Sequence, residues 1–310
     1  MLTARAGHRQ CFLRAVNPVV LSCPAKLNLL LAVTGRRPDG FHELVSVVAP
    51  VEFGDTLTIE PAKEFSLTCD EASVPSDGTN LVLKAAEAFR QATGGSGGAR
   101  FTLTKRIPVG AGLGGGSSDA ATALQGLNQL AGGTLTPAAL AQIAAGVGSD
   151  CALFLPGGPV IMRGRGERVE KMRDPAAGAL RGRRVLIFKP AFAIATPWAY
   201  AALAAQTRRG YRPGAEAEAR VAAFVHAAGT ESPVEGLLFN DLERVAFPKF
   251  VALPVLLEQL IRRFGLAPRL SGSGSACFAL LPDGAPVPDI VAAVRAAWGA
   301  STLVVETRLA

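Results

Sequence analysis

The sequence is short of aromatic side chains, and its few cysteines form no recognisable disulfide or metal pattern. Only 6% of the 310 residues are aromatic, which is low for a protein that stacks single-stranded bases. The five cysteines are odd in number and contain no Cys-x-x-Cys pair, which excludes a disulfide framework and a zinc site. Buried free thiols are typical of the reducing cytoplasm, which is where we expect the protein.

No stretch of the sequence has the length and apolar continuity of a membrane span. The longest uncharged stretch, Ala120–Ser149, is broken at Gly132 and Pro137 and contains several amide side chains, so it predicts a buried helical hairpin. Acidic residues are also missing before Asp39, a bias that transit peptides share. Because apolar patterning begins near Val19, we expect a frayed extension or a start codon placed too early there instead.

The charge balance does not by itself identify a partner. Lysine and arginine number 32 against 25 acidic residues, which gives a formal net charge of +7. Such an excess is compatible with nucleic acid or with phosphorylated small molecules. The basic residues form short scattered pairs rather than a tract interleaved with aromatics, so an RNA-binding protein remains only an alternative hypothesis.

Glycine is the residue in excess, and it is concentrated at two places. The chain has 34 glycines in 310 residues, against roughly 7% in average proteins. The clusters lie at residues 110–116 and 272–274. The first belongs to the segment PVGAGLGGGSS (108–118), which follows a strand-like run and opens a helix-like one. Backbone N–H groups at such a helix start can cradle a phosphate, so we expect a phosphate-binding loop.

The common phosphate motifs do not account for this loop. A Walker A motif needs a lysine after its last glycine, whereas Ser117 and Ser118 follow Gly116. The GxGxxG spacing is present, but the acidic residue that reads the ribose of a dinucleotide is missing from Ala120–Ser149. Protein-kinase signatures are absent as well. The residues therefore indicate a nucleoside triphosphate site of another class, in which Ser118 could meet a phosphate-bound Mg²⁺.

The order of elements favours an α+β protein of two domains. Strands are predicted at Val19–Val33, in two pieces of Glu43–Ile59 broken by Pro50 and by a turn at Gly54 and Asp55, and again from Arg184 onward. Helical spacing marks Asn80–Ala92 and Ser117–Leu130, and Thr136 and Pro137 supply an N-cap and a first-turn proline for a helix to about Ala145. The run Cys151–Leu155 is predicted as an apolar strand. Further helices and strands alternate irregularly to the end of the chain, which does not fit a regular βαβ array. We place the domain boundary between residues 182 and 183.

Three segments together resemble the GHMP kinase superfamily. PVGAGLGGGSSDAA is similar to its second motif, Pro24–Asn28 (PAKLN) to its first and Leu270–Ala276 (LSGSGSA) to its third, in the expected order. The resemblance implies the two-domain GHMP kinase fold. Residues 1–182 would form a ribosomal-protein-S5-like domain that binds ATP, and residues 183–310 a ferredoxin-like substrate domain.

Within this superfamily, the match is best to the branch that acts on cytidine diphosphate methylerythritol in the non-mevalonate isoprenoid route. The segments PAKLNLLLAVTGRRPDGFHEL, Gly148–Asp150 and Asn240–Glu243 carry that similarity. It implies ATP-dependent phosphorylation of a hydroxyl (the 2-hydroxyl in the family), with ATP and Mg²⁺ as cofactors. We expect a monomer or weak dimer with no nucleic acid or membrane partner. A homoserine or mevalonate type of GHMP kinase is the alternative within the superfamily.

The resemblance assigns two catalytic residues, Lys26 and Asp150. Asp150 is the first carboxylate after the uncharged stretch and is implied as the base that takes the proton of the acceptor hydroxyl. Lys26 is implied to polarise that hydroxyl. A nearby ammonium keeps a carboxylate ionised but lowers its basicity, so positioning should contribute more than proton affinity.

The remaining site residues also follow from the resemblance. Phe41, where the family usually has tyrosine, would stack on the cytosine, and His42 would hydrogen-bond it. Tyr200, with Trp198 as a rival, would close the stack from the other side. The other substrate contacts are implied at Asn28, Thr196, Gly272, Ser273 and Gly274. The ATP contacts are implied at Asn80, Leu81, Lys105, Pro108, Val109, Gly110, Ala111, Gly112, Leu113, Gly114, Gly115, Gly116, Ser117 and Ser118, with Ser118 also as a metal ligand.

Overall fold

Strands β1 (Val19–Arg36) and β2 (His42–Ala62) are long, and each contributes residues to two structural units. The computed structural model describes residues 17–206 and 210–310. Of these residues, the first unit comprises 17–23, 55–106 and 116–155, and the second comprises 24–54, 107–115, 156–206 and 210–310. Expectations for the chain before residue 17 lie outside the described residues.

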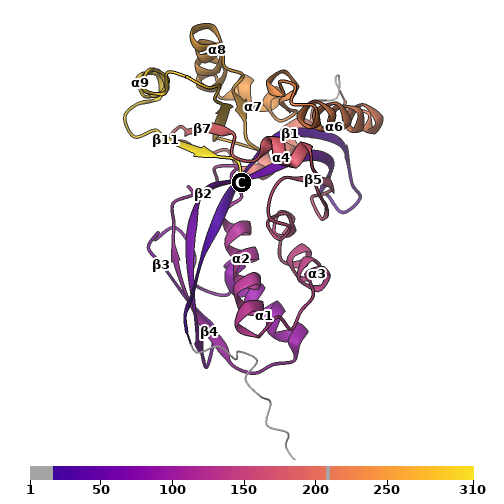
Figure 1. Ribbon diagram of the computed structural model, residues 1–310, viewed down its shortest axis with the longest axis vertical. Helices are drawn as coiled ribbons and strands as arrows, with labels where there is room; N and C mark the ends of the chain where they lie inside the picture. The colour runs from indigo at the N-terminus through magenta and orange to yellow at the C-terminus, as the bar shows by residue number, and fades with distance from the viewer. Residues whose placement is uncertain (1–16, 207–209) are drawn as a thin grey trace, which may run out of the picture. The chain divides into compact units, whose positions relative to one another are not determined.

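In the first unit, three helices lie on one side of a small sheet. The last part of β2 pairs antiparallel with β4 (Gly98–Thr104), and β4 pairs parallel with β3 (Ser66–Cys69). Figure 1 shows α1, α2 and α3 on the same face of these strands. The helices span Leu81–Thr93, Gly115–Leu130 and Pro137–Val147, respectively.

Helix α2 contacts the sheet closely because it carries a glycine on its inner face. A Cβ added at Gly126 would lie 2.3 Å from Cδ1 of Ile59 and 3.0 Å from Cδ1 of Leu21. The predicted helix starts are confirmed by their caps, since Asn80 accepts a hydrogen bond from the N–H of Val82 and Thr136 from that of Ala139. The apolar run Cys151–Leu155, which follows α3, is predicted as a strand, but it contains the short 3₁₀ helix η1 (Ala152–Phe154).

The second unit contains two sheets. In the first of them, β1 pairs parallel with β8 (Phe239–Asn240), while the first part of β2 pairs with β5 (Val160–Gly164), which in turn pairs with β6 (Arg168–Lys171). The other sheet is antiparallel, in the order β11-β7-β10-β9. These strands span Leu303–Arg308, Arg184–Lys189, Cys277–Leu280 and Arg269–Leu270.

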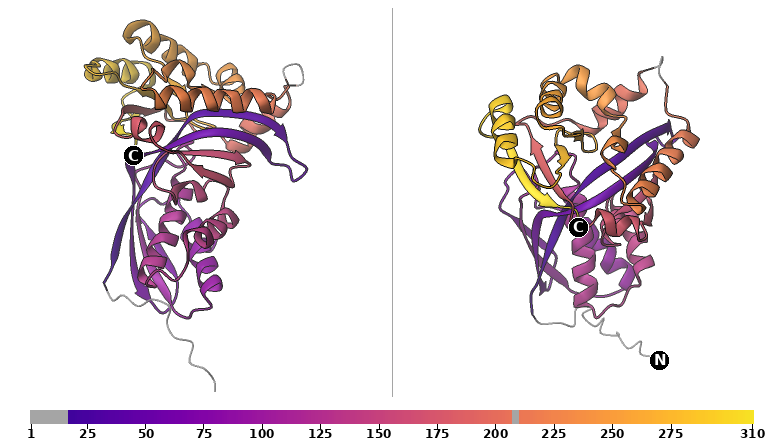
Figure 2. Two further views of the ribbon diagram at one scale, coloured as in Figure 1. Left: turned by 45° about the vertical axis from the view of Figure 1, so that its right-hand side comes forward. Right: turned by 45° about the horizontal axis from the view of Figure 1, so that its top comes forward.

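Apolar residues far apart in the chain form the core of this unit. Buried side chains of β1 and β2, such as Leu29 and Val47, belong to one cluster with Ile187, Phe224 and Phe278. Figure 2 shows α6 lying across the extended β1–β2 pair. The unit's helices are α4 (Ala176–Leu180), α5 (Thr196–Ala204), α6 (Gly214–Gly229), η2 (Glu235–Leu237), α7 (Glu243–Lys249), α8 (Ala252–Phe264) and α9 (Val287–Trp298).

The expected breaks in β2 at Pro50 and at the turn of Gly54 and Asp55 are absent, because β2 is one strand from His42 to Ala62. Along one edge, β2 pairs with β5 through residues 44–48 and with β4 through residues 56–62, so Pro50 falls between the two ladders and removes no hydrogen bond from either. The units interleave along the chain, and a division at residue 182 stays a prediction. Among the described residues, no helix combines the length and apolar character needed to cross a membrane.

Candidate active site

The glycine loop before α2 has a backbone that only glycine adopts readily. Gly110, Gly112 and Gly114 have φ of +66°, +78° and +74°, in the left-handed region. Alternating left-handed residues turn the chain sharply into the start of α2 at Gly115. The first N–H groups of that helix have no intrahelical acceptor, and together with the glycine backbone they can receive a phosphate.

Three motifs far apart in the sequence meet around Gly112. A Cβ at this position would lie 2.2 Å from the carbonyl oxygen of Ser271 and 2.9 Å from the nitrogen of Gly274. The hydroxyl of Ser271 donates to the carbonyl oxygen of Gly112 (3.1 Å), and the N–H of Lys26 donates to that of Leu113 (2.9 Å). The two glycine loops and the PAKLN strand therefore form one constellation within the second unit.

Lys26 and Asn28 point from β1 toward the second glycine loop. Both side chains are buried, and the Lys26 ammonium donates to Oδ1 of Asn28. A Cβ at Gly272 would lie 3.1 Å from Nζ of Lys26 and 3.2 Å from Oδ1 of Asn28. Nδ2 of Asn28 donates to Ser46 (2.9 Å), whose hydroxyl donates to the carbonyl oxygen of Leu30 (2.6 Å). This chain of hydrogen bonds fixes the orientation of the Asn28 amide.

The segment Asn240–Glu243 supports the second glycine loop. Nδ2 of Asn240 donates to the carbonyl oxygens of Leu270 and Gly272, each at 2.8 Å. Oε1 of Glu243 accepts from the N–H of Leu270 at 2.9 Å. Burial raises the pKa of Glu243 to about 7, and the hydrogen bond from Leu270 opposes that rise. Asn240 and Glu243 thus fix the backbone of Leu270, where the second glycine loop begins, through its C=O and its N–H group.

A set of rings surrounds His42 at the start of β2. The Tyr200 ring lies 4.9 Å from the His42 ring, and the Tyr211 ring lies edge-on at 5.8 Å. The buried Nε2 of His42 has no hydrogen-bond partner among the described residues. Burial and the nearby charge of Arg36 lower the pKa of His42, so the ring is neutral at pH 7.

Phe41 and Trp198 have different surroundings. Phe41 is 47% exposed, and the Arg165 guanidinium lies 4.9 Å from the centre of its ring. Trp198 packs edge-on against Phe250 at 5.5 Å, with the Lys249 ammonium 4.1 Å from its ring. Trp198 and Tyr200 lie two residues apart on α5, which directs them to opposite sides of the helix. Tyr200 is therefore the aromatic residue of this helix that contacts His42.

Helix α5 also brings a hydroxyl to the second glycine loop. Oγ1 of Thr196, the first residue of α5, lies 2.7 Å from Oγ of Ser273. The hydroxyl of Ser275 hydrogen-bonds the carbonyl oxygen of Phe192. The loop is therefore attached to the segment before α5 as well as to β1.

In the first unit, a buried lysine is enclosed by two carboxylates beside α2. The Lys105 ammonium forms ion pairs with Asp55 and, at 2.9 Å, with Asp119. Burial raises the pKa of Asp119 to about 7, against the opposing charge of Lys105. Ser118 is fully buried, and its hydroxyl has no hydrogen-bond partner among the described residues. Lys105 thus attaches the start of α2 to the neighbouring strands.

Asp150 follows α3, in a turn of the first unit. The N–H of Cys151 donates to the carbonyl oxygen of Gly148 at 3.1 Å, which closes this turn. Burial raises the pKa of the Cys151 thiol to about 11, so it is not a nucleophile at neutral pH. Lys26 belongs to the second unit, and its pairing with Asp150 stays a prediction.

Comparisons with known proteins identify the family. The sequence profile of the GHMP kinases N terminal domain matches residues 80–159, and that of the GHMP kinases C terminal domain matches residues 224–300. A protein of Gloeobacter violaceus named 4-diphosphocytidyl-2-C-methyl-D-erythritol kinase is 37% identical over 94% of this chain and 95% of its own length. A protein of the same name from Carboxydothermus hydrogenoformans is 38% identical over 84% of this chain and 88% of its own. The chain belongs to the 4-diphosphocytidyl-2-C-methyl-D-erythritol kinase family.

Solved structures agree with this assignment. A crystal structure of 4-(cytidine 5'-diphospho)-2C-methyl-D-erythritol kinase matches with a TM-score of 0.74 and 33% identity, over 94% of this chain and 100% of that one. Homoserine kinase from Cytophaga hutchinsonii reaches the same TM-score at 18% identity, over 100% of this chain and 98% of that one, and therefore shows the fold alone. The predicted α+β GHMP kinase fold is confirmed.

Several residues of this family site were missed by the sequence analysis. Ser46 and Ser271, which hold Asn28 and the glycine loop, each occupy a fully buried position. A polar residue inside an apolar run, as Ser46 is in Leu44–Ala49, was a usable signal, because buried hydroxyls need a partner. Tyr211 and Arg165 lie in polar, glycine-rich segments and gave no such signal.

Proposed function

We propose that the protein transfers the γ-phosphoryl group of ATP to a hydroxyl of 4-diphosphocytidyl-2-C-methyl-D-erythritol. The observation that carries the proposal is the sequence identity of 37–38%, over 84–94% of this chain, to relatives named for that substrate. The meeting of the PAKLN strand with both glycine loops around Gly112 supports it independently. The 2-hydroxyl is the acceptor that the family implies.

The glycine loop and the start of α2 would bind the phosphates of ATP. Backbone N–H groups there can donate to phosphate oxygens without any lysine of the Walker type. Mg²⁺ prefers hard oxygen ligands, and the hydroxyl of Ser118 and Oδ1 of Asp119 are buried oxygens with no hydrogen-bond partner among the described residues. This donor set fits the ion, which would neutralise charge on the phosphates. Asn80 caps α1 with its side chain, so its predicted role and that of Leu81 near the adenine rest on the resemblance.

Lys26, Asn28 and Asp150 would act on the acceptor. Phosphoryl transfer needs the hydroxyl positioned in line and its proton removed as the new bond forms. We assign Asp150 as the base and Lys26 as the cation that polarises the hydroxyl. Asn28, whose amide is fixed by Ser46 and Lys26, would orient the methylerythritol portion. Thr196 and the Gly272–Gly274 backbone would contact the same molecule.

His42 and the rings around it would recognise the cytosine. A neutral imidazole offers one N–H donor and one acceptor nitrogen, which matches the edge of a nucleobase. Base–aromatic stacking contributes about 1–3 kcal/mol per base, so Phe41 and Tyr200 would add substantially to affinity. Homoserine and mevalonate contain no base, and nothing in a kinase for them needs such a set of rings.

A coupled assay of ADP release tests the proposal. We expect turnover with 4-diphosphocytidyl-2-C-methyl-D-erythritol and none above background with methylerythritol phosphate, homoserine or mevalonate. Preference for homoserine or mevalonate would contradict the proposal in favour of another GHMP kinase. Salt-dependent RNA binding without ATP turnover would contradict it in favour of the nucleic-acid alternative. The cytoplasmic location and the monomer or weak dimer stay predictions.

A further inference from the structure

Both tyrosines of the chain pack against the same histidine. The sequence contains two tyrosines, Tyr200 and Tyr211, and each ring contacts that of His42. The interplanar angles are 34° for Tyr200 and 63° for Tyr211, so one ring lies tilted over the imidazole and the other meets it edge-on. Contacts from two directions restrict rotation of the imidazole about its side-chain bonds.

Both chain neighbours of Tyr211, Gly210 and Arg212, form hydrogen bonds through their backbone. The backbone N–H of Arg212 donates to the carbonyl oxygen of Val33 near the end of β1, at 3.1 Å. On the other side, the carbonyl oxygen of Gly210 accepts from the guanidinium of Arg244 at 3.5 Å. Arg244 also donates to the side chain of Gln206 at 3.2 Å.

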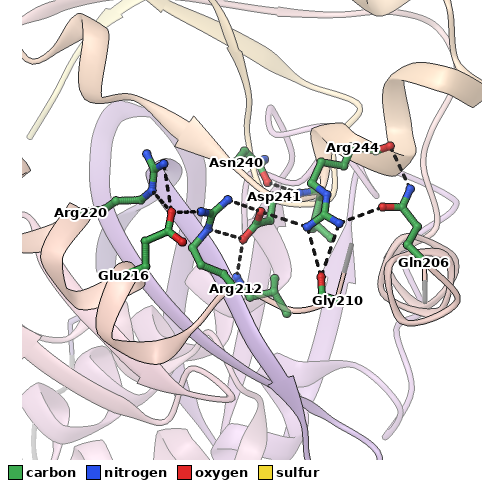
Figure 3. Close-up of polar contacts among 10 residues, drawn as sticks. Gln206, Gly210, Arg212, Glu216, Arg220, Asn240, Asp241 and Arg244 are labelled. Atoms are coloured by element: carbon green, nitrogen blue, oxygen red, sulfur yellow. Dashed lines mark hydrogen bonds and ion pairs between the residues drawn. The ribbon is translucent and has the colours of Figure 1, made fainter. Parts of the chain in front are cut away.

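Asp241 is the residue on which these contacts converge, as Figure 3 shows. Its side chain is 1% exposed. Arg212 donates to both of its oxygens, from Nη2 at 3.0 Å and from Nε at 3.3 Å, and Arg244 forms an ion pair with it at 3.7 Å. The same carboxylate accepts from the N–H of Val33 at 3.0 Å. A bidentate contact between a guanidinium and a carboxylate fixes the orientation of the two groups as well as the distance between them.

We propose that Tyr211 determines specificity for the base by fixing His42, and that Asp241 positions Tyr211 through Arg212. This inference rests on the proposed function, because it assumes that His42 faces the cytosine. Nitrogen 3 accepts a hydrogen bond in cytosine and carries a proton in uracil. An imidazole held in one orientation keeps one ring nitrogen aligned with that position, and the tautomer that protonates this nitrogen donates to cytosine but not to uracil. A rotating imidazole loses this alignment and with it the discrimination between the two bases.

Steady-state kinetics with a cytidine substrate and a uridine substrate test the role of Tyr211. The substrates are 4-diphosphocytidyl-2-C-methyl-D-erythritol and its uridine counterpart, assayed with wild type, Tyr211→Ala and Tyr211→Phe. For Tyr211→Ala we expect the KM of the cytidine substrate to rise about 3- to 10-fold and the preference for cytidine over uridine to fall by a similar factor. The KM for ATP should stay within about twofold. Tyr211→Phe keeps the ring and should restore the wild-type values.

Two further variants test the positioning role of Asp241. Asp241→Asn removes the negative charge that Arg212 and Arg244 share. Arg212→Lys keeps a cation but loses the bidentate contact with Asp241. Both should raise the KM of the cytidine substrate in the manner of Tyr211→Ala. If Asp241→Asn does not fold, as judged by circular dichroism, Arg212→Lys decides the question. Glu216→Gln is the matched control, because it removes an exposed partner of Arg212 and should leave KM unchanged.

The outcomes separate this inference from the proposed function. An unchanged KM and base preference in Tyr211→Ala would overturn the role of Tyr211. Equal rises in the KM of both ATP and the cytidine substrate would do the same, since they would show general distortion. Wild-type kinetics in Arg212→Lys would overturn the positioning role of Asp241. A wild-type enzyme that does not turn over the cytidine substrate would overturn the proposed function itself, and this inference with it.

Discussion

At the scale of single residues, Lys26 and Asp150 carry the largest expected effects. Lys26→Ala and Asp150→Asn should each lower kcat by about 100- to 10,000-fold, because general acid–base groups contribute on that order. ATP binding should persist, since neither side chain belongs to the phosphate loop. Steady-state turnover and calorimetric titration of a non-hydrolysable ATP analogue measure the two properties. Near-normal turnover in both variants would show that the assignment is wrong.

His42 predicts a pH dependence confined to the cytidine substrate. Burial lowers the pKa of this imidazole below its ordinary value of 6.5, so the ring is neutral at pH 7 and gains a proton only as the solution becomes acidic. The KM for the cytidine substrate should therefore rise as the pH falls from about 6.5 toward 5, while the KM for ATP stays level.

The variant His42→Gln provides the comparison for that profile. Its amide does not titrate, so it should show a raised KM that no longer changes with pH. The unfolded chain takes up the proton before the folded one, so acidification through 6.5 should also lower the free energy of unfolding of wild type relative to His42→Gln. Parallel pH profiles for wild type and variant would contradict the role of His42.

At the scale of elements, the glycine loop and the turn between α2 and α3 offer a matched pair. Gly112 and Gly133 have nearly equal φ, +78° and +75°, but a Cβ would lie 2.2 Å from Ser271 at the first position and meet nothing within 4 Å at the second. Gly133→Ala should cost about 1 kcal/mol of unfolding free energy from backbone strain alone. Gly112→Ala should cost about 3 kcal/mol and lower turnover about 100-fold, because it also displaces the second glycine loop.

Chemical denaturation and steady-state kinetics of both variants measure these effects. Equal losses of stability and activity at the two positions would show that the close approach of Gly112 to Ser271 contributes nothing. A loss of activity at Gly112 without loss of stability would still place the loop in the site, but would contradict its packing role.

Local signals predicted most elements, and the failures have identifiable causes. Asn80 and Thr136 marked helix starts because each has a side-chain oxygen suited to capping. Pro50 led to the incorrect prediction of a break, because a proline interrupts a strand only where its missing N–H would face a neighbouring strand. The sequence does not show which strands pair with β2 at that position. The apolar run at Cys151–Leu155 is too short for periodicity to distinguish a strand from a turn of 3₁₀ helix.

The site was predictable where glycine is dense or where a segment resembles a family motif. The first glycine loop was predicted from its glycines, and Lys26 and Asn28 from the resemblance of PAKLN; the structure brings them together with the second glycine loop. Ser271 and Asp241 lie in segments that resemble the family, but their hydrogen bonds to distant backbone groups do not show in a sequence. Tyr211 contacts the ring of His42, far away in the chain, and no spacing pattern indicates that contact. Lys105 was predicted near the adenine, whereas its ammonium is enclosed by Asp55 and Asp119, so its ATP contact stays a prediction.

At the scale of the whole molecule, the interleaving of the two units along the chain predicts that a fragment beginning at residue 183 does not fold by itself. The core of the second unit combines Leu29 and Val47 with Ile187 and Phe278, from both sides of residue 182. A fragment of residues 183–310 would therefore expose much of that core. We expect no cooperative thermal unfolding of this fragment by circular dichroism, in contrast to the intact chain. A sharp transition in the isolated fragment would support a division at residue 182 instead.

The pairing of both tyrosines with His42 also makes the protein convenient to observe. Biosynthetic replacement of tyrosine by 3-fluorotyrosine introduces two fluorine nuclei, and both would lie beside the imidazole. A fluorine spectrum of the intact protein would then consist of two resonances, each sensitive to what occupies that end of the site. Titration with nucleotides of different bases could be followed through these signals without a coupled enzyme or an added dye.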